Sequence, residues 1–484
     1  MSLRARILAL FIGCAVVVPA EAQSPPPPPR TRVINRQHEE WKTQADQAYR
    51  QGDFDKSIEL TERVITANPN DDVALYLRGS ARVEFGARTR NADLVRNGIA
   101  DAREAIRIVN RVKIDYYLPY LYGMSQLSGL EGKTSHAETA RDVAAQLLEM
   151  ESVTVAEKAN IAYQRALLNI QLQDRDAALV DFAKAVEFEP QHLAAQLGRC
   201  DLLLQTAQPD QVEQAYAEIV EKFPQEPLVF NNRGMFFQSF GRNDEAIADF
   251  TKAIEINAQY VPAYTNRAYS KLEAGAFSEA IADLNKAVEI DPQYPAAHSL
   301  RGSAYLQSGD ANSALADYEA ALQLNPDNPQ VRSDVGFAQF FAGKYDLALT
   351  SFDSALEADP QARFLNPWCA SALLYAGRRA DAEQRFADVI AKPADQRDWF
   401  DLLTLLVLGK VTDNDALATV SEGDEQAADA QKCEAFYFIG QRLLFEEKPE
   451  EAEPFFRQAL ESKSLHLSAF RGAQFALGEF GPRA

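Results

Sequence analysis

The sequence predicts an all-α solenoid, which is a stack of paired helices. The prediction rests on one repeat period that three kinds of residue share. Glycines recur every 34 residues, alanines keep the same step, and a large apolar side chain follows each alanine. A fixed period of this length is typical of arrays in which each repeat packs on its neighbours. The glycines are Gly241, Gly275, Gly309, Gly343 and Gly377; the alanines are Ala246, Ala280, Ala314, Ala348 and Ala382; the large residues are Phe250, Leu284, Tyr318, Phe352 and Phe386.

Residues 261–294 illustrate one repeat, which we expect to form a helix, a tight turn and a second helix. The turn falls at Gly275, because glycine adopts a left-handed backbone without a Cβ penalty. Residues in phase with Ser278 are expected to be the N-caps of the second helices, since their short polar side chains suit that position. These N-caps are Asp176, Asp210, Asp244, Ser278, Asn312 and Asp346. Prolines end the second helices at Pro190, Pro224, Pro292, Pro326 and Pro360.

The repeat resembles the tetratricopeptide repeat (TPR). One unit carries the whole spacing of that repeat, in Gly302, Tyr305, Gly309, Ala314, Tyr318, Ala321 and Pro326. The phase is unbroken over about residues 159–394. The resemblance implies a right-handed superhelix of about twelve to thirteen helix-turn-helix units. It also implies that the inner helices line a groove that binds a protein or a peptide.

Composition shifts and phase breaks divide the chain into six segments. We expect a signal peptide over 1–22, a Pro-rich linker over 23–37, irregular repeats over 38–158, a regular array over 159–394, an atypical helical pair over 395–432, and a closing repeat with a capping helix over 433–484. Within the irregular repeats, seven extra residues separate Gly86 from Gly98. The arginines between these glycines predict a basic loop.

The amino terminus predicts export. Arg4 and Arg6 precede an apolar run over 7–18, and Ala20-Glu21-Ala22 is a small-x-small cleavage site. The apolar run is too short to cross a bilayer. A periplasmic or secreted location follows. The alternative is a lipoprotein, because residues 11–14 faintly resemble a lipoprotein box; membrane attachment is expected only if Cys14 carries a lipid.

Residues 433–460 resemble the closing repeat of NlpI-type TPR lipoproteins. The matching residues are Gly440, Leu443, Ala452, Phe456 and Ala459. In that family the solenoid is an envelope adaptor that presents proteases and cell-wall hydrolases to their targets. The resemblance therefore implies an adaptor role in a bacterial envelope.

Charge and cysteine content exclude several classes of partner. A formal net charge of −21 argues against nucleic acid, which binds basic surfaces. Cys200, Cys369 and Cys433 lie far apart without a CxxC spacing, so we expect three small buried side chains and no zinc site. A Cys200–Cys369 or Cys369–Cys433 disulfide is the alternative. No metal, cofactor or small-molecule substrate is expected.

No motif of catalysis stands out. The sequence has no HExxH, no GxSxG, no Gly-rich phosphate loop and no Asp-rich calcium loop. The acidic pairs fall at the spacing of helix surfaces, where ion pairs explain them. The chain is therefore expected to be a non-catalytic scaffold.

The better candidate site is the inner wall of the array. Residues at i, i+3, i+4 and i+7 share one face of a helix, and in TPR arrays such a face of each first helix lines the groove. We expect Asn232 and Asn266 to clamp a peptide backbone, because a carboxamide both donates and accepts. Further along, where the stripe also holds Asp334, the wall becomes aromatic. The predicted peptide-binding residues are Asn231, Asn232, Gln238, Asn266, Tyr269, Ser303, Phe337, Phe340, Phe341 and Trp368. Packing between adjacent first helices is the alternative explanation for the aromatic residues.

A second set of residues recurs once per repeat and carries charge. Arginines lie at Arg165, Arg199, Arg233, Arg267 and Arg301, and aspartates follow four of them sixteen residues later, at Asp181, Asp249, Asp283 and Asp317. We interpret the two series as structural ion pairs between helices. A clamp for an anionic ligand is the functional alternative.

Together these patterns predict an exported adaptor that recruits a protein or peptide into its concave groove. The alternative from another class is an accessory structural subunit of an envelope secretion or assembly machine. In that case the outer face of the array would make the contacts.

Overall fold

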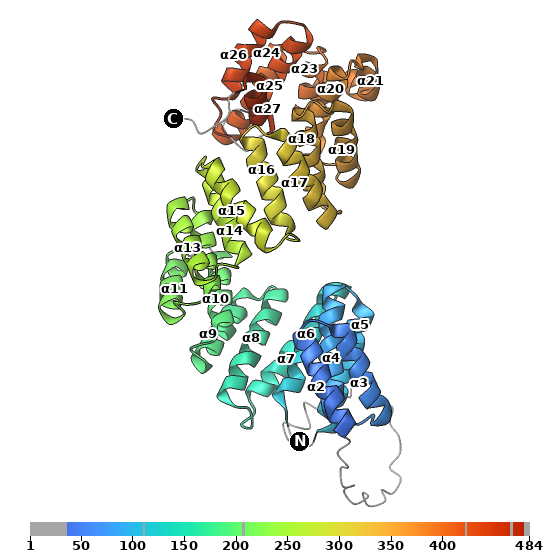
Figure 1. The fold of residues 1–484 in the computed structure, drawn as a ribbon, viewed down its shortest axis with the longest axis vertical. Coiled ribbons are helices and arrows are strands. Elements are labelled where there is room, and N and C mark those ends of the chain that lie inside the picture. The colour runs from blue at the N-terminus through green and yellow to red at the C-terminus, as the bar shows by residue number, and fades with distance from the viewer. Residues whose placement is uncertain (1–35, 110–111, 206–208, 422–423, 465–467, 479–484) are drawn as a thin grey trace, which may run out of the picture. The chain divides into compact units, whose positions relative to one another are not determined.

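The computed structural model describes residues 36–109, 112–205, 209–421, 424–464 and 468–478 (Figure 1). The predicted signal peptide and most of the Pro-rich linker therefore lie outside the described residues. The chain divides into two compact units, residues 1–224 and residues 225–484. The described residues contain helices and no strand, which confirms the all-α class.

The first unit consists of consecutive antiparallel helix pairs. Its helices are α2 (Arg36–Arg50), α3 (Phe54–Ala67), α4 (Asp72–Arg88), α5 (Ala92–Ile108), α6 (Ile114–Glu131), α7 (Thr134–Leu148), α8 (Val155–Gln171), α9 (Arg175–Phe188), α10 (Leu193–Gln205) and α11 (Pro209–Lys222). Each helix packs mainly on the one before it and the one after it. Neighbour-only packing is the mark of a solenoid.

The second unit continues the pairs and then departs from them. Its regular helices are α12 (Pro227–Ser239), α13 (Asn243–Ile256), α14 (Val261–Glu273), α15 (Phe277–Ile290), α16 (Pro295–Gln307), α17 (Ala311–Leu324), α18 (Pro329–Phe341) and α19 (Tyr345–Ala358). The remaining ones are η1 (Arg363–Leu365), α20 (Asn366–Tyr375), α21 (Arg379–Arg385), α22 (Ala387–Ala391), η2 (Ala394–Gln396), α23 (Trp399–Val407), α24 (Asp413–Leu417), α25 (Glu425–Phe445), α26 (Pro449–Ala459) and α27 (Ser468–Leu477).

The turn glycines behave as predicted. Gly241, Gly275 and Gly343 have φ angles of 70°, 73° and 74°, in the left-handed region that favours glycine. Gln173 takes the equivalent place between α8 and α9 and adopts the same conformation, with φ of 62°. The backbone geometry of the turn is therefore kept even where the glycine is absent.

The predicted N-caps are wrong by two residues. Helix α13 begins at Asn243, so Asp244 lies second in the helix, and α17 is capped by Asp310, whose carboxylate accepts from the backbone N–H of Ser313 at 3.0 Å. The second helix starts two residues after the left-handed glycine, so the single residue between them is the cap. An acidic side chain such as Asp244 instead lies in the first turn, where it favours the positive end of the helix dipole.

The core between paired helices depends on a glycine facing a ring. The phenyl ring of Phe250 is fully buried, and a Cβ built on Gly234 would lie 2.6 Å from it. Gly336 meets Phe352 at the same distance. Because real Cβ atoms do not approach a ring so closely, only glycine allows the two helices of a pair to pack at this spacing.

The predicted basic loop between Gly86 and Gly98 is wrong. Helix α4 runs through Gly86 to Arg88, and α5 begins at Ala92, so only three residues connect two 17-residue helices. The extra residues lengthen the helices. Asn91 caps α5 by accepting from the backbone N–H of Leu94 at 3.1 Å, which ends the connection early.

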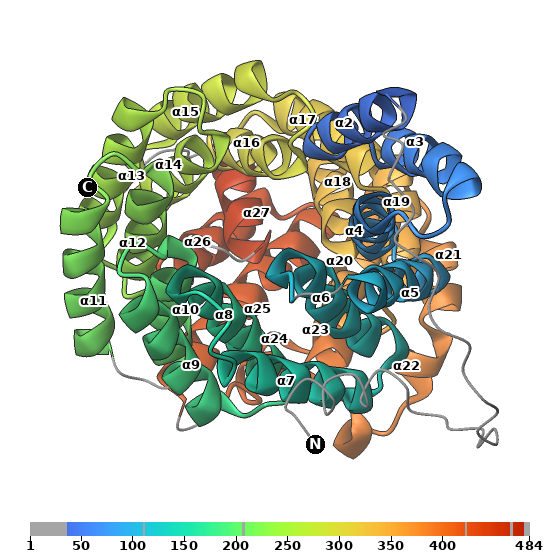
Figure 2. The same ribbon diagram turned by 90° about the horizontal axis from the view of Figure 1, so that it is seen from below.

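The carboxyl-terminal part of the second unit departs from the regular helix pairs. Helices α23 and α24 are short, and α25 runs from Glu425 to Phe445, across residue 433. Helices α25 and α26 form the closing pair. Helix α27 packs on α25, α26 and α18, and Figure 2 shows it inside the curve that α14, α16 and α18 make.

The cysteines and the hydropathy of the helices complete the description. Cys200, Cys369 and Cys433 are buried, as expected, and each is free. Cys14 lies outside the described residues. None of the helices in the described part of the chain combines the length and apolar character that crossing a membrane requires.

Candidate functional site

The arginine series forms structural ion pairs. Nε and Nη2 of Arg233 donate to the two carboxylate oxygens of Asp249, each at 2.7 Å, and Asp249 is buried. The other pairs with the same bidentate geometry are Arg165–Asp181, Arg267–Asp283 and Arg301–Asp317. The structural interpretation is confirmed for these four pairs, whose guanidinium groups are already engaged. Arg199 is exposed, and Ala215 stands where an aspartate would complete its pair.

Hydrogen bonds join the predicted amides across α12 and α14. Nδ2 of Asn266 donates to Oδ1 of Asn231 at 3.0 Å, and Nδ2 of Asn231 donates to Oδ1 of Asn232 at 3.4 Å. Gln238 Nε2 donates to Ser270 Oγ at 2.8 Å and to the carbonyl of Asn266 at 3.3 Å. Asn231 is buried, so its role is to orient the other two. Among the described residues, no hydrogen bond occupies Nδ2 of Asn232 or Oδ1 of Asn266.

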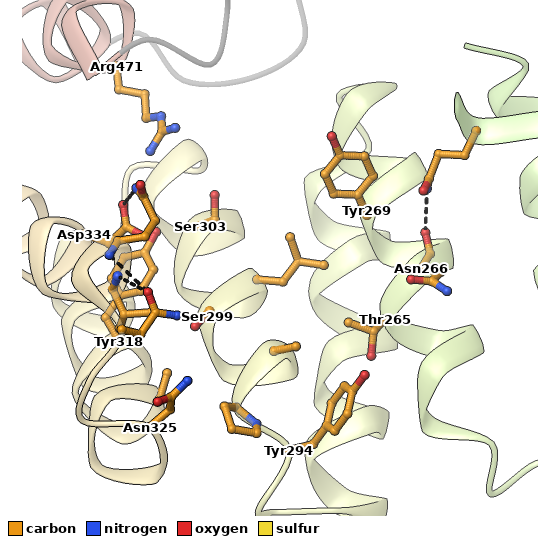
Figure 3. A pocket seen from close by; sticks show the side chains of 18 residues that line it. Thr265, Asn266, Tyr269, Tyr294, Ser299, Ser303, Tyr318, Asn325, Asp334 and Arg471 are labelled. Atoms are coloured by element: carbon orange, nitrogen blue, oxygen red, sulfur yellow. Dashed lines mark hydrogen bonds between the residues drawn. The ribbon is translucent and has the colours of Figure 1, made fainter. Parts of the chain in front are cut away.

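A polar cavity of about 750 Å³ lies beside these amides, on α14, α16 and α18 (Figure 3). Of its eighteen lining side chains, eleven carry an amide or a hydroxyl group and five are apolar. The lining residues are Gln238, Thr265, Asn266, Tyr269, Tyr294, Pro295, Ala296, Ser299, Leu300, Ser303, Tyr318, Ala321, Asn325, Asn328, Gln330, Val331, Asp334 and Arg471. Its size falls within the range of ligand-binding clefts, and its many donors and acceptors suit a polar chain such as a peptide backbone.

One end of the cavity carries charge. Asp334 lies on α18, and Figure 3 shows Arg471 reaching toward it from α27. The carboxylate of Asp334 accepts from Gln330 Nε2 at 3.3 Å. Burial raises the pKa of Asp334 to about 6, and the nearby Arg471 guanidinium and the hydrogen bond from Gln330 oppose this rise only in part. Burial also raises the pKa of Tyr318, which lies beside Asp334.

Four of the ten predicted groove residues line this cavity: Gln238, Asn266, Tyr269 and Ser303. Asn232 is half-buried on α12, outside the lining. Tyr269 is 45% exposed, the most open of the ten. The inner wall therefore presents the polar part of the predicted stripe to solvent.

The aromatic part of the stripe is not open to a ligand, which corrects the expectation for four residues. Phe337, Phe340 and Trp368 are at most 5% exposed and pack against one another with ring centroids 5.1–5.2 Å apart. Phe341 is half-buried, and the ring of Phe475 on α27 stacks on it at 4.5 Å. Helices α25 and α27 close over this part of α18 and α20, so packing within the chain explains these rings.

Sequence reasoning missed several lining residues, among them Arg471, Tyr294, Asn325 and Asn328. Three of these lie in or next to the turns that join successive repeats, and a search along the inner helices does not reach those turns. The constant repeat length could have indicated Tyr294 and Asn328, since these two residues stand one period apart. Arg471 had no signal, because α27 falls outside the repeat.

The first unit has a smaller cavity, of about 310 Å³, between α5, α6 and α7. Arg96 and His136 line it, but both contact Glu131: Nε of Arg96 donates to this carboxylate at 2.9 Å, and Nε2 of His136 lies 3.3 Å from it. The side-chain hydrogen bonds from Lys133, Arg96 and His136 lower the pKa of Glu131 to about 2. Glu131 thus offsets the positive charge at this cavity.

Within the residues that the structure describes, no group of three or more His, Cys, Asp or Glu side chains is placed to hold a metal ion. The candidate site is the polar cavity together with the amides next to it.

Comparison with protein families identifies the repeat. Family models described as tetratricopeptide repeats match residues 42–106, 169–231, 229–260 and 305–366, and one described as TPR repeat matches residues 268–309. The chain belongs to the class of helical repeat scaffolds. It is a tetratricopeptide repeat protein.

Solved structures similar to parts of this chain include two that are described as TPR proteins. A tetratricopeptide repeat protein from Parabacteroides merdae is 19% identical, with 55% of this chain and 98% of that chain covered at a TM-score of 0.37. PilF of Pseudomonas aeruginosa is 17% identical, with 43% and 94% covered at 0.38. YrrB, a TPR protein with an unusual peptide-binding site, is 16% identical, with 54% and 98% covered at 0.29. No curated protein matches the sequence.

Proposed function

We propose that the protein is an exported, non-catalytic adaptor of the bacterial cell envelope that binds a peptide segment of a partner protein. The segment lies along the inner helices α12, α14, α16 and α18, in and beside the polar cavity. The class of the protein supports this proposal, because repeat arrays present extended inner surfaces to other chains. The resemblance of residues 433–460 to envelope adaptors adds support.

The observation that carries the proposal is the cavity itself. It combines a volume of about 750 Å³ with a wall of amides and hydroxyls from three successive repeats. The carboxamide of Asn266 lines the cavity, and the buried Asn231 links it by hydrogen bonds to the carboxamide of Asn232, which lies outside the lining. A peptide backbone offers the complementary acceptor and donor at regular spacing.

The alternative role, a structural subunit of an envelope machine, has weaker support. It would use the outer helices of the array. Exposed apolar side chains on the outer helices include Val180 on α9 and Leu347 on α19. Single exposed apolar residues are normal on any protein surface.

The groove is tested by replacing both Asn232 and Asn266 with alanine. The double variant should capture crosslinked partners from the envelope fraction about tenfold less well, because two hydrogen bonds to the bound segment are lost. The measurement is quantitative mass spectrometry of the captured proteins. Circular dichroism should show unchanged helix content.

The matched control is Asn312→Ala, which removes an exposed amide from the outer helix α17. This variant should capture the same proteins as the wild type. Equal capture by all three proteins would show that the inner face does not bind the partner.

The export part of the proposal has its own test. Expressed with its full amino terminus, the protein should appear in the periplasmic or secreted fraction with Gln23 as its first residue, because cleavage follows Ala22. Amino-terminal sequencing and the intact mass measure this. A lipid-modified Cys14 at the start would establish the lipoprotein alternative, and an uncleaved cytoplasmic product would contradict export.

A further inference from the structure

The Asp334 end of the cavity has an acidic group that the fold leaves partly unsatisfied. Asp334 is half-buried on α18, and the hydrogen bond to its carboxylate comes from Gln330 on the same helix, at the long distance of 3.3 Å. By contrast, each aspartate of the arginine series accepts two short bonds from one guanidinium. Asp334 thus resembles a carboxylate placed for binding more than one placed for packing.

The charged and titratable groups that face Asp334 do not fully stabilise its ionised carboxylate. These groups are Arg471 of α27 and Tyr318 of α17. The positive charge of Arg471 favours the ionised carboxylate, yet burial outweighs it and raises the pKa of Asp334 to about 6. A second cation inside the cavity would therefore stabilise the ionised form further.

The opposite side of the groove exposes apolar surface. Met235 on α12 and Tyr269 on α14 stand one period apart and are 48% and 45% exposed. Phe337, two periods beyond Tyr269, is buried under α20 and its neighbours. The exposed apolar surface of the inner wall is thus concentrated at the α12–α14 end, while the acidic group lies at the α18 end.

From this arrangement we propose that the bound peptide places a lysine or arginine side chain against Asp334 and an apolar side chain against Met235 and Tyr269. This inference rests on the proposed function and specifies its ligand. Long-range attraction supports it, because a chain with a net charge of −21 draws basic segments toward it.

The helix spacing fixes the distance between the two anchor residues of the peptide. Neighbouring helices pack roughly 10 Å apart, so the path from α14 past α16 to α18 measures about 20 Å. An extended chain advances about 3.3 Å per residue. The apolar and basic residues of the peptide should therefore stand about six positions apart.

A random dodecapeptide display library tests the specificity of the full-length protein. The wild type should enrich lysine or arginine at one position and an apolar residue about six positions away. Asp334→Asn should lose the basic preference and retain the apolar one. For one selected peptide, the same substitution should weaken binding about tenfold to a hundredfold, because a charge-assisted contact is lost.

Asp327→Asn is the matched control. It removes the same charge from the turn before α18, where the side chain is fully exposed and outside the cavity. This variant should select the same peptides as the wild type. A basic preference that persists in Asp334→Asn, or that is lost equally in Asp327→Asn, would overturn the assignment to Asp334.

The pH dependence of the wild type gives a second measurement that needs no variant. Only the ionised carboxylate attracts the ligand cation, so affinity is full above the pKa near 6 and falls as the pH drops through it. Between pH 7.5 and pH 5 the selected peptide should bind about tenfold less tightly. The same peptide with norleucine in place of its basic residue should show no such change; an equal change would contradict the inference.

The outcomes separate this inference from the proposed function. Selection of peptides without any basic preference would overturn the role of Asp334 and leave the peptide-binding groove in place. Failure of the wild type to enrich any peptide, together with unchanged capture by the Asn232/Asn266 variant, would overturn both.

Discussion

Replacing Phe250 with alanine is expected to lower the free energy of local unfolding of α12–α14 by about 3–5 kcal/mol. The phenyl ring is fully buried, and Gly234, which packs directly against it, has no side chain to fill the space. Because units of a solenoid open separately, the change should appear as faster amide hydrogen exchange in these three helices.

Phe240→Ala is the matched control for this prediction. It removes the same side chain from the same repeat, but Phe240 is 49% exposed and leaves no cavity. The control should change exchange in α12–α14 only slightly. Similar losses of protection in the two variants would show that the pairing of Gly234 with Phe250 does not determine the packing.

Replacing Asp283 with alanine is expected to destabilise α14 and α15 by about 2–4 kcal/mol. Its buried carboxylate accepts from Arg267 at 2.6 and 2.8 Å and pairs with Lys271 at 2.9 Å. The substitution leaves Arg267 without its carboxylate partner, and Lys271 keeps only the exposed Glu279, at 3.4 Å. Thermal melting and hydrogen exchange of these helices would measure the loss.

Two further variants test the cause. Asp327→Ala removes an exposed carboxylate and should have almost no effect. Adding Arg267→Leu to Asp283→Ala should recover part of the loss, since the guanidinium that lost its carboxylate partner is then gone. If the double variant were less stable than Asp283→Ala alone, the ion pair would not be the source of the effect.

The repeat period predicted the fold because each of its positions depends on local packing. The left-handed turn at Gly275 and the ring of Phe250 need only the neighbouring helix to fix their surroundings. The N-caps were misplaced by two residues because Asp244 suits both a cap and a first turn. The spacing alone does not distinguish these two positions.

The candidate site was predictable only where the inner wall is made by the repeat itself. Asn266, Tyr269 and Ser303 line the cavity as the stripe indicated, although binding by them stays a prediction. The aromatic residues failed because α27, which has no place in the period, folds back on α18. Contacts between segments so far apart in the chain leave no local pattern in the sequence.

The stacking of Phe475 on Phe341 also has a mechanical consequence. In an ordinary solenoid each repeat contacts only its neighbours, so the array can extend under tension like a spring. Here the stacked rings join α27 to α18, so these two helices and the helices between them form a closed loop of contacts. Under a pulling force this portion should move as one stiff block, and the elasticity of the unit should reside in α12–α17.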